Sequence, residues 1–207
     1  IIRCYFLISY DYQAPIGEFG LVRDSYQNLR ILHTFLKDFG SILAPMETVL
    51  PEGYEKITPD NRETLRYAAR MKEDAGLLFM TNFQDHDTAR FDQTDLQLKL
   101  KLKKQTLIIP SSKTFTLKKD QSVILPFNLS MEGALLKYST TQLLAKVEEK
   151  NAVHYFFFAP EGLRTEYSFD KSTLSSGKEF YTPKPGLKST FSITVKNGKT
   201  LKITALT

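Results

Sequence analysis

The stretch LQLKLKL at positions 96–102 alternates leucine with a polar residue over seven positions. Successive side chains of a β-strand point to opposite faces of its sheet, so this pattern places the leucines on one face and Gln97, Lys99 and Lys101 on the other. A period of two does not gather apolar residues on one side of a helix. The stretch therefore predicts a half-buried strand in an antiparallel sheet with one wet face.

Short strand-like runs continue on both sides of this stretch. Upstream, alternation at positions 65–69 is followed by a turn at 73–76 and an apolar run at 77–80. Asn197-Gly198 near the C-terminus favours a tight hairpin turn in which both residues take positive φ. Many short strands separated by turn signals are typical of an antiparallel β-sandwich or barrel. Further runs are predicted at 106–109, 113–117, 122–129, 134–139, 141–147, 152–159, 164–169, 188–195 and 200–206.

One segment near the N-terminus predicts an α-helix. Positions 22–39 carry Tyr26, Leu29 and Leu36 at helical spacing, and further apolar residues widen the same stripe. Gly40 follows as the expected C-terminal cap, with Pro45 beyond it. The predicted fold is therefore mainly β, an antiparallel β-sandwich with one N-terminal α-helix.

Composition and charge narrow the function classes. The chain has 207 residues, 42% of them hydrophobic and 25% charged, which excludes collagen-like and disordered sequence. It is too short for a complete eight-fold α/β barrel, which takes about 250 residues. The net charge is +5, but the lysines are spread through strand-like segments, which favours solvated faces over a nucleic-acid site. No apolar run is long enough to predict a membrane span.

Motifs that carry chemistry are absent from the sequence. It has no phosphate-binding glycine loop, zinc-protease motif or nucleophile elbow. His33, His86 and His154 lack the spacing of metal ligands, so we expect no metal and no cofactor. Cys4 is the only cysteine, which excludes an intramolecular disulfide.

Residues 9–18, SYDYQAPIGE, resemble the S-Y-D-Y-D-A-P-I/L-x-E segment of β-galactosidases of glycoside hydrolase family 35. Later stretches are similar to the region after the barrel in bacterial members: LFMTNF at 78–83, IPSS at 109–112, ILPFNL at 124–129 and FAPEG at 158–162. The catalytic domain of that family is an eight-fold α/β barrel, and the first segment ends its eighth strand. The helix is then the remnant of a truncated barrel.

The resemblance implies a domain organisation and a site. Residues 1–45 would be the remnant of the last β/α unit of a glycosidase barrel, and residues 46–207 an antiparallel β-sandwich domain. Both catalytic glutamates of the family would lie upstream, so this chain would hold no catalytic residue and would be inactive alone. Tyr12, and beside it Tyr10, would bind the substrate galactose in the intact parent, because a phenol offers both a hydroxyl and an apolar ring to a sugar.

The resulting hypothesis is a non-catalytic C-terminal portion of a β-galactosidase-like glycoside hydrolase that supports the barrel and the rim of its cleft. Its expected partners are the missing barrel domain, a galactoside in the intact parent, and a second copy paired through the strand-like residues 1–9. Nucleic acid and membrane are not expected partners, and the resemblance favours an exported or periplasmic protein. The alternative is a carbohydrate-binding module with an aromatic platform on one sheet face, formed by Tyr138, Tyr155, Tyr167 and Tyr181. A third hypothesis is that the C-terminal half of the chain, which is rich in lysine, binds acidic polymers.

Overall fold

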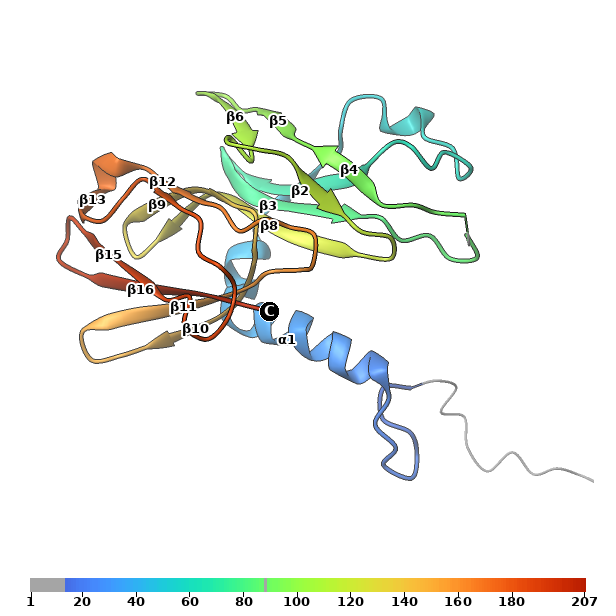
Figure 1. Ribbon diagram of the computed structural model, residues 1–207, viewed down its shortest axis with the longest axis horizontal. Coiled ribbons are helices and arrows are strands. Elements are labelled where there is room, and N and C mark those ends of the chain that lie inside the picture. The colour runs from blue at the N-terminus through green and yellow to red at the C-terminus, as the bar shows by residue number, and fades with distance from the viewer. Residues whose placement is uncertain (1–13, 88) are drawn as a thin grey trace, which may run out of the picture.

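The larger of two packed sheets has the strand order β1-β2-β3-β8-β9-β12-β14, with antiparallel neighbours throughout. The computed structural model in Figure 1 describes residues 14–87 and 89–207. The strands of this sheet are β1 (Glu47–Val49), β2 (Arg66–Lys72), β3 (Ala75–Thr81), β8 (Ser122–Met131), β9 (Ala134–Ser139), β12 (Tyr167–Phe169) and β14 (Phe180–Tyr181).

The second sheet has the order β10-β11-β16-β15-β13 and packs against the first. Its strands β11 and β16 run parallel, and between them the chain alternates between the sheets, with β12 and β14 in the larger sheet and β13 and β15 in this one. The remaining pairs are antiparallel, so the predicted β-sandwich is confirmed. The strands are β10 (Gln142–Glu148), β11 (Ala152–Phe158), β13 (Leu174–Ser176), β15 (Phe191–Val195) and β16 (Thr200–Leu206).

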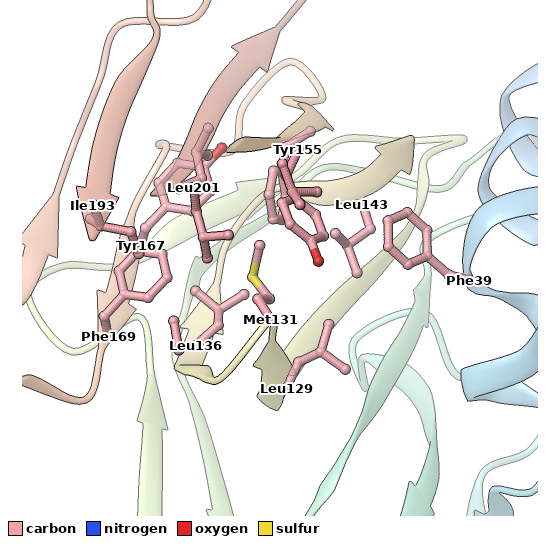
Figure 2. Packing of buried hydrophobic residues seen from close by; sticks show 14 of the residues in the cluster. Phe39, Leu129, Met131, Leu136, Leu143, Tyr155, Tyr167, Phe169, Ile193 and Leu201 are labelled. Carbon is pink, nitrogen blue, oxygen red and sulfur yellow. The ribbon is translucent and has the colours of Figure 1, made fainter. Parts of the chain in front are cut away.

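Side chains from both sheets fill one hydrophobic core. In Figure 2, Met131 and Leu136 of the larger sheet face Tyr155 and Leu201 of the smaller one, and Phe39 closes one end. Phe157 of β11 is fully buried here and meets the ring of Tyr167 edge to face, with ring centroids 5.1 Å apart. Burial of these large side chains is the main favourable contribution to folding.

Two small ribbons cover the outer face of the larger sheet and close a second core. The predicted strand at 96–102 lies here, but it is divided between β4 (Gln93–Leu96), which pairs with β7 (Phe115–Leu117), and β5 (Leu98–Lys101), which pairs with β6 (Thr106–Ile109). Asp95 has a φ of 54°, within the register shift of the β4–β7 pair. The alternation itself is confirmed, since Leu98 is buried and Lys99 is exposed.

The helix α1 (Asp24–Leu43) begins and ends later than predicted. Gly40 lies inside the helix and does not cap it; the helix ends at Leu43, two residues before Pro45, which has no backbone N–H with which to continue the helical hydrogen bonds. Only Phe35 and Phe39 are buried, and the Asp38 carboxylate accepts a hydrogen bond of 2.9 Å from the backbone N–H of Lys146 in β10. The C-terminal half of the helix is therefore part of the sandwich.

No helix among the described residues is long and apolar enough to cross a membrane.

The predicted hairpin at Asn197-Gly198 joins β15 to β16, but with a different turn. The loop has three residues, closed by a hydrogen bond from the Val195 N–H to the carbonyl of Lys199, and Gly198 takes a φ of 86° while Asn197 keeps a negative φ. The Asn197 side chain instead donates to the carbonyl of Glu132, in the turn between β8 and β9. This contact ties the two sheets together.

The described part of the chain also contains two short 3-10 helices, η1 (Tyr54–Lys56) and η2 (Lys171–Thr173).

Candidate functional site

The site residues predicted from the resemblance, Tyr10 and Tyr12, lie outside the described residues. The same holds for residues 1–9, which carry the predicted dimer contact. Both predictions therefore stay predictions, and the site has to be sought in the part of the chain from residue 14 onward.

The predicted aromatic platform is wrong. Tyr138, Tyr155 and Tyr167 are 2%, 4% and 0% exposed, so their rings lie in the hydrophobic cores and not on a sheet surface. Tyr181 is half-buried and stacks on Phe191, with ring centroids 4.0 Å apart. Tyr138, Tyr155 and Tyr167 therefore lie on the inward faces of their strands.

The histidines do not form a metal centre. His33 is exposed on α1, His86 is exposed in a turn with a φ of 59°, and His154 shares a hydrogen bond of 2.8 Å with the hydroxyl of Thr204. Burial lowers the pKa of His154, although Glu149 opposes the shift. Within residues 14–87 and 89–207, no group of three histidine, cysteine or acidic side chains could hold a metal ion.

Glu166 is the one acidic residue that is buried among the described residues. Glu166 is 2% exposed and accepts hydrogen bonds from the Tyr138 hydroxyl, the Ser112 hydroxyl and the backbone N–H of Ser111, the last at 3.1 Å. Burial acts to raise the pKa of Glu166, but these hydrogen bonds outweigh it and hold the pKa below its usual range. Burial and the adjacent carboxylate raise the pKa of Tyr138 to about 12.

The Glu166 carboxylate holds neighbouring segments of the chain together. Both carboxylate oxygens of Glu166 accept hydrogen bonds from the loop at 110–112, and the Glu166 backbone N–H donates to the Thr140 hydroxyl at 2.7 Å. A general base needs a free oxygen within reach of a substrate proton, and a general acid needs a raised pKa. Glu166 has neither, so it is a structural group that fixes the loop to β9 and β12.

Within the described residues, large apolar side chains are exposed on α1 and on the segment before it. Figure 1 shows the N-terminal half of α1 extending away from the sheets, with a small hairpin at its end. In that hairpin, where Ile16 and Val22 form a β-bridge, Phe19 and Leu21 are 87% and 63% exposed. Leu32 on the helix is 38% exposed. Large apolar side chains exposed to this extent are typical of an interaction surface.

A groove of about 1120 Å³ continues this surface between α1 and the larger sheet. One wall is Asn28, Ile31 and Leu32 of the helix, and the other is formed by strands β2, β3 and β8. Phe83, which is 52% exposed, and Arg66 lie among the residues that line it. Part of this surface could be predicted from the sequence of the helix, because its apolar stripe is wider than the two residues that the sandwich buries. The groove itself depends on long-range packing.

The comparisons with known proteins agree with the fold. The model of a family described as beta-galactosidase, domain 2 matches residues 52–206, which is almost the whole of the sandwich. No curated protein matches the chain. The match begins after the helix and its groove wall, so it covers the β-rich part that the resemblance assigns to the region following the barrel.

Proposed function

The chain belongs to the family of β-galactosidase domain 2, and from this premise we propose that it is the non-catalytic C-terminal portion of a β-galactosidase-like glycoside hydrolase. In the parent, of the glycoside hydrolase family 35 type, an upstream barrel would hydrolyse terminal β-galactosides. The domain would support the last helix of that barrel and shape the rim of its substrate cleft. Tyr12 and Tyr10 would contact galactose there.

The observation that carries this proposal is the division of α1 into two halves. Phe35 and Phe39 are buried in the sandwich, whereas no residue of the helix before Phe35 is buried and Leu32 is 38% exposed. A helix with an apolar stripe needs a covering along its whole length, so the exposed half calls for a second domain. A barrel that uses α1 as its last helix would cover the exposed half and the groove wall together.

The hydrogen bonds and ion pairs of the acidic side chains favour a supporting role over a catalytic role. A retaining glycosidase needs two carboxyl groups about 5–5.5 Å apart beside the scissile bond. The buried carboxylate of Glu166 accepts hydrogen bonds at both oxygens, and Glu132 is paired with Lys199. These two carboxylates stabilise the domain and are not free to act as an acid or a nucleophile.

The variant Leu32→Lys tests the proposed interface. In the 207-residue chain we expect it to change the free energy of unfolding by less than about 0.5 kcal/mol, because Leu32 is already solvent-exposed. In the longer polypeptide with the upstream barrel, we expect a loss of about 2 kcal/mol, from the apolar burial forgone and the lysine charge brought into an interface. Urea unfolding of both polypeptides measures the difference.

The matched control is Leu187→Lys, because Leu187 is 87% exposed and does not line the groove. It is expected to be neutral in both polypeptides. Equal small effects of Leu32→Lys in the short and the long polypeptide would contradict the proposed interface.

A further inference from the structure

Three arginines gather where the loop before β2 meets the loop after β3. This arginine cluster is Arg62, Arg66 and Arg90. The Arg62 Nε lies 2.9 Å from each carboxylate oxygen of Asp87, which therefore neutralises one of the three charges. The pKa of Arg90 is lowered, first by burial and then by the nearby charge of Arg66, and the charges of Asp87 and Asp120 oppose this only in part.

Arg90 is 4% exposed, and only one edge of its guanidinium is used. Its Nε donates to the backbone carbonyl of Asn82 at 3.1 Å and to the Asn82 side-chain oxygen at 2.9 Å. Asn82 is itself fully buried and donates to the carbonyls of Phe91 and Leu117, so the orientation of Arg90 is fixed. The two terminal nitrogens, Nη1 and Nη2, are buried and have no hydrogen-bond partner among the described residues.

Arg66 repeats this arrangement beside it. Its Nη2 lies 3.1 Å from the carbonyl oxygen of Pro59 and within 3.3 Å of those of Thr58 and Asn61, which anchors the side chain to the preceding loop. Its Nε is buried and also lacks a partner in the described parts of the chain. Arg66 lines the groove beside α1, whereas Arg62 and Arg90 do not, so Arg66 is the member of the cluster that a ligand in the groove would meet first.

Buried cationic donors without acceptors are costly to a folded protein. A buried polar group with no partner costs about 1–3 kcal/mol, and more when it is charged. Here the unpaired donors belong to two neighbouring guanidinium groups, and the adjacent carboxylate of Asp87 is already held by Arg62. The ligand that satisfies both the donors and the charge is an anion with at least two oxygens, since a guanidinium edge binds such a group through two parallel hydrogen bonds.

We propose that the arginine cluster is a binding site for a small oxyanion, a carboxylate or a sulfate group, held by Nη1 and Nη2 of Arg90 and by Nε of Arg66. The anion is either a free inorganic ion or the acidic substituent of a sugar. The site belongs to this domain alone and does not depend on the proposed barrel.

Thermal unfolding of the 207-residue chain tests the site. Sodium sulfate and sodium galacturonate are compared with sodium chloride at equal ionic strength, and galactose serves as the uncharged sugar. At a concentration a hundred times Kd, a ligand that binds only the folded state raises Tm by about 5–10 °C. A rise with sulfate alone that Arg90→Gln abolishes assigns an inorganic ion, because exclusion of sulfate from the protein surface stabilises both proteins equally, and a rise with galacturonate but not galactose assigns the sugar carboxylate. No rise beyond that in chloride would overturn the proposal.

Two variants tie the effect to the cluster. Arg90→Gln removes the charge and the terminal donors, and we expect it to abolish the anion-specific rise. Arg164→Gln is the matched control, because the Arg164 side chain is exposed on another part of the chain, and it should keep the full rise. If Arg90→Gln does not fold, Arg66→Gln takes its place with an expected tenfold or greater loss of anion affinity by calorimetry. An undiminished anion effect in the cluster variants would refute the assignment.

Discussion

Replacing Phe157 by alanine is expected to lower the free energy of unfolding by about 3–5 kcal/mol. The side chain is fully buried between the two sheets, and it lies on β11, which pairs with β10 on one side and β16 on the other. The surrounding strands cannot close the space left behind, and the edge-to-face contact with Tyr167 is also lost. Urea unfolding followed by circular dichroism measures the change.

The neighbouring Phe156→Ala provides the control. Phe156 points to the opposite face of the same strand, is half-buried, and stacks on His154 with ring centroids 4.1 Å apart. Its removal should cost less than half as much, since the site already borders solvent. Equal losses for the two variants would contradict the position of the core between the sheets.

Replacing Glu166 by alanine is expected to cost about 2–4 kcal/mol, because it removes the charged acceptor of the buried Tyr138 hydroxyl and of the Ser111 N–H and leaves them only each other and the Ser111 hydroxyl. The wild-type protein should also lose stability in acid. The folded-state pKa of Glu166 is depressed, so the unfolded chain binds the proton more readily. The contribution is complete above the unfolded pKa of about 4.3 and is lost as the pH falls through the lower folded value.

Unfolding free energies measured between pH 3 and pH 7 for wild type and Glu166→Gln test this account. The Gln variant should be less stable at neutral pH and should lose less stability as the pH falls. Glu179→Gln is the control, since Glu179 forms only a partly exposed ion pair with Lys137, and it should behave like wild type within about 1 kcal/mol. A Glu166→Gln variant with the acid dependence of wild type would show that the carboxylate does not carry the effect.

Most strands could be predicted because one of their faces is buried. The alternation at 96–102 placed Leu98 inward and Lys99 outward, as the structure has them. The division of that stretch could not be predicted, because it follows from a positive φ at Asp95 and from pairing with two different partners. The strand β1 has no buried side chain, so it leaves no pattern in the sequence.

Features that join distant parts of the chain had no local signal. The hydrogen bond between Tyr138 and Glu166 joins residues 28 positions apart, and the fixation of Arg90 by Asn82 depends on a buried loop. The sequence does not indicate which face of a strand a single tyrosine occupies. Tyr138 and Tyr167 could therefore be expected on an exposed platform, although both are buried. The apolar stripe of α1 could be read from the sequence, but not which half of it the sandwich covers.

The most direct test of the supporting role is hydrolysis of a chromogenic β-galactoside, measured in parallel for the 207-residue chain and for the polypeptide that includes the upstream barrel. We predict turnover by the longer polypeptide and none above the buffer rate by the 207-residue chain. Turnover by the 207-residue chain that disappears when one of its own carboxylates is replaced, Glu166→Gln for example, would contradict the account.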